Sequence, residues 1–210
     1  MENFLREIYD GVLNGKASTV EANVQAALQN GIQPKEILDR GLVSAMAEVG
    51  RRFENDECFV PEMLISARAM QAGMTMLKPY LIEAKVTASG KVAIGTVKGD
   101  LHDIGKNLVG MMLEGAGFEV LDLGVDVSPE KFAESADRVD VIALSALLTT
   151  TMPNMKATID ALQLAGKRSK VKVVIGGAPI TEAYAQQIGA DGFAPDASRA
   201  VAVTKAILSI

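Results

Sequence analysis

The segment KVAIGTVKGDLHDIGKNLVGMM, residues 91–112, decides how the second half of the chain folds. Its first seven residues are mostly apolar, which is typical of a strand buried on both faces of a sheet. A polar loop containing two glycines follows at 98–105, and apolar side chains then recur at helical spacing over 105–116. A buried strand, a loop and a helix in this order begin a βα unit, the building block of a parallel sheet.

The same alternation continues to the end of the chain. Further strand-like runs are FEVLDLG, VDVIALSA, VKVVIGG and a weaker DGFAP, and amphipathic stretches separate them at 130–137, 152–166 and 180–189. We therefore predict an α/β Rossmann-like (flavodoxin-like) domain with a five-stranded parallel sheet over residues 91–210. Ligands of such sheets bind beyond the carboxyl ends of the strands. Polar or glycine-rich loops occupy those positions at 98–105, 145–151 and 176–179.

The chain before residue 88 has a different pattern, with apolar residues at helical spacing and short polar breaks. It predicts an all-α bundle of four or five helices over residues 1–87. Ser18 is expected to cap the second helix, and Pro79 is expected to break or kink the last one. The small and polar residues 85–90 are interpreted as a linker between the two domains.

The composition excludes several classes of protein. The net charge is −5 and no basic stripe is present, which argues against nucleic-acid binding. The longest apolar runs are too short to span a bilayer, and the first residues lack a signal-peptide pattern. Cys58 is the single cysteine, so no internal disulfide can form. These features predict a cytoplasmic protein.

The loop GDLHDIGKN, residues 99–107, contains the single histidine of the chain. Its glycine spacing fits neither the phosphate loop nor the dinucleotide fingerprint. Asp100 and His102 are two residues apart, so in an extended segment both side chains project to the same side. Asp100 could hold one ring nitrogen and leave the other free, as in metal-bound histidines. The alternative is an ordinary loop histidine that is hydrogen-bonded to a neighbour and binds no ligand.

Four motifs carry a resemblance to a known family. DLHDIG (100–105) is similar to the Asp-x-His-x-x-Gly signature of cobalamin-binding domains. SALLTT (145–150) and GGAP (176–179) are similar to the Ser-x-Leu and Gly-Gly elements of the same domains. FVPEMLISARAM (59–70) resembles part of the helical cap beside them. Together these motifs resemble the corrinoid proteins of multi-component methyltransferase systems and the cap and cobalamin domains of methionine synthase.

The resemblance implies a role for each motif residue. His102 would replace the cofactor's own base as the lower axial ligand of cobalt, the base-off/His-on form. Asp100 would accept the proton on the other ring nitrogen, and Thr151 would extend this pair into a triad or merely cap a helix. The remaining cofactor-binding residues implied are Asp103, Ile104, Gly105, Ser145, Leu147, Thr149, Gly176 and Gly177, with Phe59, Val60 and Met63 of the cap over the reactive face. Core packing and ordinary turns are the alternative explanations for most of them.

The function implied by the resemblance is that of a methyl carrier loaded with cobalamin, as methylcobalamin or cob(I)alamin, or with a related corrinoid. A substrate-specific corrinoid methyltransferase would load the methyl group, and a second methyltransferase would pass it to tetrahydrofolate or a thiol. A reductive activase is a third expected partner, whereas nucleic acid and membranes are not expected. The chain would then be a subunit that is not catalytic alone. The alternatives are a cobalamin-dependent sensor, the small subunit of a cobalamin-dependent mutase, and a flavodoxin-like protein without corrin. Methanol, methylamines, betaines and aryl methyl ethers all remain open as methyl donors.

Overall fold

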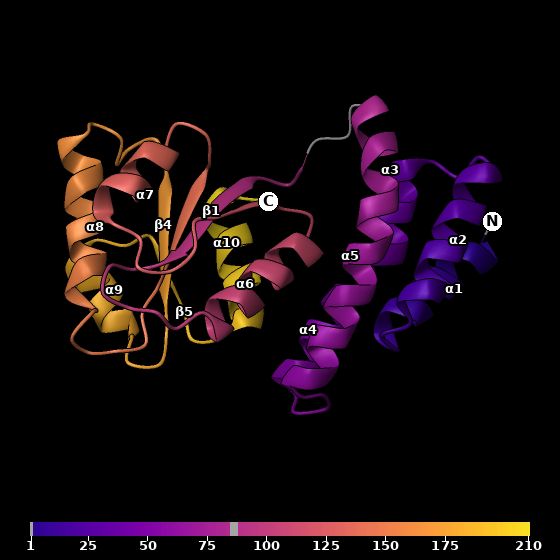
Figure 1. Ribbon diagram of the computed structural model, residues 1–210, viewed down its shortest axis with the longest axis horizontal. Coiled ribbons are helices and arrows are strands. Elements are labelled where there is room, and N and C mark those ends of the chain that lie inside the picture. Colours follow the sequence, from indigo (N-terminus) through magenta and orange to yellow (C-terminus); the bar gives the residue numbers. More distant parts are fainter. Residues whose placement is uncertain (1, 85–87) are drawn as a thin grey trace. The chain divides into compact units, whose positions relative to one another are not determined.

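The computed structural model describes residues 2–84 and 88–210, which form two compact units. One unit is helical and the other is built on a sheet (Figure 1). The first comprises Met1–Ala88 with Gly115–Gly117, and the second comprises Ser89–Glu114 with Phe118–Ile210. The linker predicted at 85–90 falls partly on residues 85–87, which lie outside the described residues. Each unit is described below by itself.

The first unit is all-helical, as predicted. Its helices are α1 (Glu2–Leu13), α2 (Ala17–Gln29), α3 (Pro34–Glu36), the π-helix η1 (Ile37–Val43), α4 (Ser44–Glu54) and α5 (Val60–Glu83). The stripes of apolar residues read from the sequence form its core, which includes the fully buried side chains of Ile8, Leu42, Met46 and Leu77. Burial of these stripes, rather than helix propensity, holds the bundle together.

Two details of the helical prediction are wrong. Pro79 does not end the last helix, because α5 runs through it to Glu83. Leu77 and Leu81 are both buried on either side of the proline, and their packing offsets the lost main-chain hydrogen bond. Ser18 does not cap α2, which begins one residue earlier with Lys16 at its cap and no side-chain hydrogen bond there.

The second unit contains the predicted parallel five-stranded sheet. Its elements are β1 (Lys91–Thr96), α6 (Ile104–Gly115), β2 (Glu119–Asp122), α7 (Pro129–Ser135), β3 (Val141–Ser145), α8 (Pro153–Leu164), β4 (Lys172–Gly176), α9 (Glu182–Ile188), β5 (Gly192–Ala194) and α10 (Ala197–Leu208). All strand pairs are parallel, in the order β2-β1-β3-β4-β5. This is the flavodoxin-like order, which confirms the predicted fold class.

Helices cover both faces of this sheet (Figure 1). Helices α7, α8 and α9 pack on one face, where the buried side chains of Phe132, Met155, Ile159 and Leu162 meet Ile142. Helices α6 and α10 lie on the other face. Burial on both faces explains why the strands appear in the sequence as continuous apolar runs. None of the helices in the described part of the chain is long and apolar enough to cross a membrane.

Candidate ligand-binding site at the carboxyl edge of the sheet

Three loops meet where β1, β3 and β4 end. Thr96 pairs in register with Ser145, and Ser145 pairs with Gly176. Since the strands are parallel, the loops that follow them emerge at the same edge of the sheet. The three sequence motifs of the second unit are therefore brought together by the register of three neighbouring strands.

Asp100 lies at the centre of this edge and is completely buried. Its Oδ1 accepts a hydrogen bond from the main-chain N–H of His102 (3.1 Å) and lies 2.7 Å from His102 Nδ1. Its Oδ2 accepts from the N–H groups of Leu147 (2.8 Å) and Leu148 (3.3 Å) and from the Thr151 hydroxyl (2.7 Å). The carboxylate thus ties the His102 loop to the loop that follows β3.

These contacts determine the charge of Asp100. Burial alone would raise its pKa, but the hydrogen bonds from His102, Leu147 and Thr151 outweigh burial and hold the pKa of Asp100 well below its ordinary value. The carboxylate is therefore ionised at neutral pH and can only accept hydrogen bonds. It follows that Nδ1 of His102 carries the proton in their mutual hydrogen bond.

With Nδ1 occupied by Asp100, Nε2 is the ring nitrogen of His102 that a ligand can reach. The side chain is 51% exposed, and no hydrogen bond to Nε2 is found among the described residues. The main chain of His102 is held by Thr96, whose buried hydroxyl donates to the His102 carbonyl oxygen at 2.8 Å. An orienting carboxylate on one ring nitrogen and an accessible lone pair on the other is the arrangement of a metal-ligating histidine.

Thr151 contacts Asp100 and does not cap helix α8. Helix α8 begins at Pro153 with Met152 at its cap, and no side-chain hydrogen bond caps it. The Thr151 hydroxyl instead lies 2.7 Å from Asp100 Oδ2 and 2.9 Å from the Leu148 carbonyl oxygen. Both neighbours are acceptors, and the carboxylate is the stronger of the two. Thr151 therefore completes a chain of contacts from hydroxyl to carboxylate to imidazole.

Gly176 and Gly177, at the end of β4, lie close to the main chain of neighbouring segments. Gly177 has φ of +134°, and a Cβ there would lie 1.9 Å from the carbonyl oxygen of Ala146. A Cβ on Gly176 would lie 2.8 Å from the carbonyl oxygen of Ala194. Only glycine fits at Gly177, so the loops after β3 and β4 can lie against each other without side chains between them.

The surface around His102 is unusually apolar for a loop region. Leu101 and Ile104 are 71% and 77% exposed, and Leu147 and Leu148 are also exposed. A Cβ added to Gly105, in the first turn of α6, would meet nothing within 4 Å. The edge therefore combines an accessible imidazole with apolar side chains and open space, which suits a large ligand with an apolar face.

The other predicted site residues of this unit have less distinctive surroundings. Ser145 and Gly176 are partly buried at the strand ends, whereas Asp103 and Thr149 are exposed. The Asp103 carbonyl oxygen accepts from Asn107 N–H (2.7 Å) in the first turn of α6. Their assignment as cofactor contacts stays a prediction.

The three predicted cap residues belong to the first unit. Phe59 precedes α5 and is 64% exposed, Val60 is partly buried, and Met63 is fully buried. The Glu62 side chain accepts a hydrogen bond from the Phe59 N–H at 2.8 Å, which fixes the main chain at the start of the helix. Of the three, Phe59 is the most exposed.

Sequence reasoning missed residues that hold the loop in place. Thr96 was interpreted only as part of a buried strand, yet its hydroxyl holds His102. Asn154 donates from its side chain to the Lys98 carbonyl oxygen at 2.8 Å. A polar residue at the end of an apolar strand was the available signal for Thr96. No local signal exists for Asn154, because its partner lies 56 residues away.

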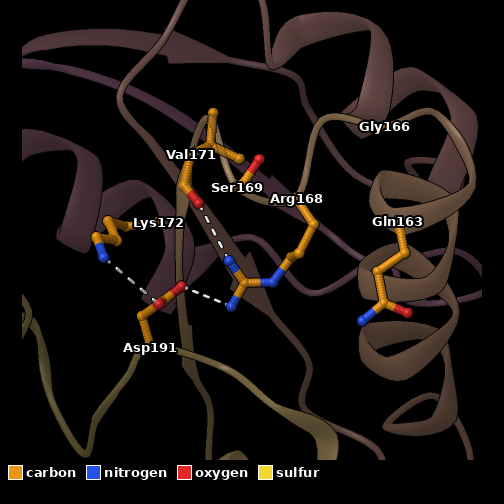
Figure 2. A pocket seen from close by; sticks show the side chains of 7 residues that line it. All are labelled: Gln163, Gly166, Arg168, Ser169, Val171, Lys172 and Asp191. Atoms are coloured by element: carbon orange, nitrogen blue, oxygen red, sulfur yellow. Dashed lines mark hydrogen bonds and ion pairs between the residues drawn. The ribbon is translucent and has the colours of Figure 1, made fainter.

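A hollow lies at the opposite edge of the sheet, where β4 and β5 begin (Figure 2). It has a volume of about 480 Å³ and is lined in part by Arg168, Lys172 and Asp191. The Arg168 guanidinium donates to Val171 O (3.1 Å) and Asp191 Oδ2 (2.7 Å), so its hydrogen-bonding groups already fasten the chain between α8 and β5. This hollow contains none of the predicted site residues.

A flavodoxin-like sheet with polar and glycine-rich loops gathered at its carboxyl edge defines the class of ligand-binding α/β domains. Comparison with known proteins identifies the ligand. A model described as a B12 binding domain matches residues 90–202, and a second B12 binding domain model matches residues 5–78.

Relatives span the whole chain. The dimethylamine corrinoid protein of Methanosarcina barkeri is 45% identical over 211 residues, covering 99% of each chain. The methanol:cobalamin methyltransferase complex of Methanosarcina barkeri contains a chain with a TM-score of 0.88 and 29% identity, covering 99% of this chain and 80% of that one. A cobalamin-binding protein from Desulfitobacterium hafniense has a TM-score of 0.79 and 31% identity, with coverage of 96% and 97%. The chain belongs to the corrinoid proteins of methyltransferase systems, which carry B12-binding domains.

The described residues fit the corrinoid that this family binds. His102 offers a nitrogen of the kind that transition metals accept, and the surrounding leucines and Ile104 offer apolar surface. A Cβ on Gly105 would meet nothing within 4 Å, and Gly177 places no side chain at the edge. Among the described residues, no cluster of three or more His, Cys, Asp or Glu side chains could hold a metal ion. A single imidazole is thus the protein ligand that this edge offers.

Replacing Asp100 by asparagine is expected to destabilise the second unit in a pH-dependent way. An asparagine side chain would turn its NH2 group toward N–H or O–H groups that now donate to Asp100. The lost hydrogen bonds should lower the free energy of unfolding by about 1–3 kcal/mol. The folded-state pKa of Asp100 lies below its ordinary value of about 3.8, so the stabilisation is fully present above that value. It is lost as the pH falls toward the folded-state pKa.

Urea unfolding at pH 7 and pH 3 measures this effect. The difference in the free energy of unfolding between wild type and Asp100→Asn should be larger at pH 7 than at pH 3. Glu134→Gln, which changes an exposed carboxylate of α7, is the matched control and should change stability by less than about 0.5 kcal/mol. Equal differences at the two pH values would contradict the role given to the ionised carboxylate.

Proposed function

We propose that this chain holds a corrinoid through His102 and carries a methyl group from a substrate-specific methyltransferase to a second methyltransferase. The observation that carries the proposal is the contact of 2.7 Å between His102 Nδ1 and the ionised Asp100, which leaves Nε2 accessible. The membership of the chain in the corrinoid protein family supports it.

The corrinoid, when bound, supplies the cobalt that accepts and releases the methyl group. His102 would hold the corrinoid through Nε2, and Asp100 would orient the ring through Nδ1. Asp100 keeps the proton of the ring on Nδ1. The lone pair of Nε2, on the other side of the ring, is therefore available to a ligand. Thr151 and the N–H groups of Leu147 and Leu148 keep Asp100 ionised and fixed. Asp100 would hold the His102 ring through Nδ1 whether or not a corrinoid is bound, because the contact of 2.7 Å is made within the chain.

The exposed apolar residues are assigned to cofactor contact and exclusion of water. Leu101, Ile104, Leu147 and Leu148 provide apolar surface beside the imidazole. In the first unit Phe59 is the leading candidate for covering the reactive face, since it is largely exposed and follows the cap motif. Apolar cover at this face would protect a reactive group from water.

The methyl donor we propose is a methylamine, with dimethylamine the first to test. A relative that is 45% identical along the whole chain is named a dimethylamine corrinoid protein. The first solved structure described above is a complex with a methyltransferase, which supports a methyltransferase partner for this chain. A second methyltransferase acting on a thiol or tetrahydrofolate, and a reductive activase, complete the proposed system.

Reconstitution tests the proposal. The purified protein is mixed with hydroxocobalamin, freed of excess cofactor, reduced, and incubated with each methylamine and the matching methyltransferase. The expected result is one bound corrinoid for each chain and methyl transfer with dimethylamine. A protein that retains no corrinoid after the excess cofactor is removed, or that accepts no methyl group from any methylamine, would contradict the proposal.

Substituting Gly105 by alanine should separate folding from cofactor binding. An added Cβ meets nothing in the protein and alanine favours helices, so the cofactor-free protein should be as stable as wild type or up to about 1 kcal/mol more stable. If the open space belongs to the corrinoid, its affinity should fall by roughly tenfold. Thermal unfolding and titration with hydroxocobalamin measure the two effects. Gly110→Ala, within α6 and in ordinary contact, is the matched control. An affinity equal to that of wild type would contradict the assignment of Gly105.

A further inference from the structure

The His102 loop is fastened to the neighbouring loop after β2 by two contacts of a single residue. Asp126 Oδ1 accepts a hydrogen bond from the Gly99 N–H at 2.7 Å. The Asp126 N–H donates in turn to the Asp100 carbonyl oxygen at 3.0 Å. These two bonds hold the entry and the exit of the segment Gly99–Asp100, so its main chain cannot tilt independently of the β2–α7 loop.

The main chain of Asp126 is itself unusual. Its φ is +52°, in the left-handed region that L side chains rarely adopt and that aspartate tolerates better than most. Such conformations persist only where the surrounding structure imposes them, and they are concentrated at functional sites. The following residue is anchored as well, because Val127 N–H donates to the Thr96 carbonyl oxygen at 2.9 Å.

Two different sets of contacts therefore position Asp100. Leu147, Leu148 and Thr151 hold its carboxylate, whereas Asp126 holds its main chain. The hydrogen bond to His102 Nδ1 needs both, since His102 follows only two residues later on the same segment. If only the carboxylate of Asp100 were fixed and its main chain were free, the imidazole of His102 could change its orientation.

We propose that Asp126 is a positioning residue for His102: by clamping Gly99 and Asp100 it sets the direction of the imidazole lone pair. This inference rests on the proposed ligation of a corrinoid by His102. The clamp itself is present in the cofactor-free chain and can be tested there. The role belongs to the side-chain oxygen as an acceptor, and not to its charge.

Three variants separate the contributions of side chain and main chain. Asp126→Asn keeps an acceptor oxygen and tolerates the left-handed conformation. Asp126→Gly keeps the conformation without the acceptor, and Asp126→Ala loses both. Glu134→Gln is the control. Because the chain has a single histidine, ¹⁵N-histidine labelling marks the His102 ring alone.

The cofactor-free proteins are examined by hydrogen exchange at the Gly99 amide and by the ¹⁵N signals of the ring. We expect wild type and Asp126→Asn to protect the Gly99 amide and to keep the proton on Nδ1. Asp126→Gly should lose about tenfold in protection and show a mixture of tautomers. Its dissociation constant for hydroxocobalamin should rise about tenfold, with a larger rise for Asp126→Ala.

Three results would overturn the inference: an unprotected Gly99 amide in wild type, wild-type behaviour of Asp126→Gly, or an Asp126→Asn protein as impaired as Asp126→Gly. Failure of the wild-type protein to bind hydroxocobalamin would instead overturn the proposed function. The amide and ring signals would still decide the role of Asp126 in that case.

Discussion

A His102→Ala protein should fold normally and lose most of its capacity to hold a corrinoid. The ring is half exposed and main-chain contacts hold its loop, so the loss of one hydrogen bond to the buried Asp100 should lower the free energy of unfolding by about 1–3 kcal/mol. Loss of a residue that merely supports a metal ligand costs about 10–100-fold in affinity, so loss of the ligand should cost on the order of 10²-fold or more. Titration with hydroxocobalamin measures this loss.

A spectroscopic measurement identifies the ligand directly. In the cobalt(II) form, the electron spin resonance spectrum of wild type prepared with ¹⁵N-histidine should show splitting by one ¹⁵N nucleus, since His102 is the single histidine. The alanine variant should lack that splitting, and added imidazole should restore a nitrogen ligand as the control. Unchanged affinity and spectra in the variant would contradict the assignment of His102.

A Gly177→Ala protein should be destabilised by at least about 4 kcal/mol, which is an exceptional loss for one methyl group. The added Cβ would lie 1.9 Å from the Ala146 carbonyl oxygen, at φ of +134°. Both partners belong to main chain at strand ends, so neither can move without breaking the hydrogen bond from Ala146 N–H to the Gly176 carbonyl oxygen. The destabilisation should therefore include the loop that supplies Leu147 and Thr151 to Asp100.

Urea unfolding followed by circular dichroism measures the loss. Gly166→Ala is the matched control, because Gly166 also has positive φ (+67°) but its Cβ would meet nothing within 4 Å. That variant should lose only about 1–2 kcal/mol, the penalty for the left-handed conformation alone. Equal losses in the two variants would show that strain in φ, and not close packing against Ala146, requires the glycine at position 177.

The predicted sheet was correct because strands buried on both faces require continuous apolar runs, which local sequence records. The same holds for the site loops, since parallel strands place every following loop at one edge. His102 and Asp100 could be paired from their spacing because they lie in one extended segment. Thr151 could be assigned only through the family resemblance, and its contact with Asp100 spans 51 residues.

Other features left no signal in the local sequence. The π-helix η1 differs from an α-helix by one residue in its hydrogen-bond register, and its composition is that of any helix. Pro79 was expected to break or kink the helix, as proline usually does. Packing of Leu77 and Leu81 instead lets the helix continue. Asp126 was not singled out from the sequence, because its partner Gly99 is 27 residues earlier. These contacts depend on which loops become neighbours, a property of the whole sheet.

Every hydrogen bond described here for the His102 loop is made by residues between Thr96 and Asn154, all within the second unit. The orientation of His102 is thus set by contacts within the second unit alone. Recombination that exchanged the helical unit for another would leave these hydrogen bonds intact. A chain with a different helical unit would therefore keep the same arrangement of imidazole, carboxylate and hydroxyl.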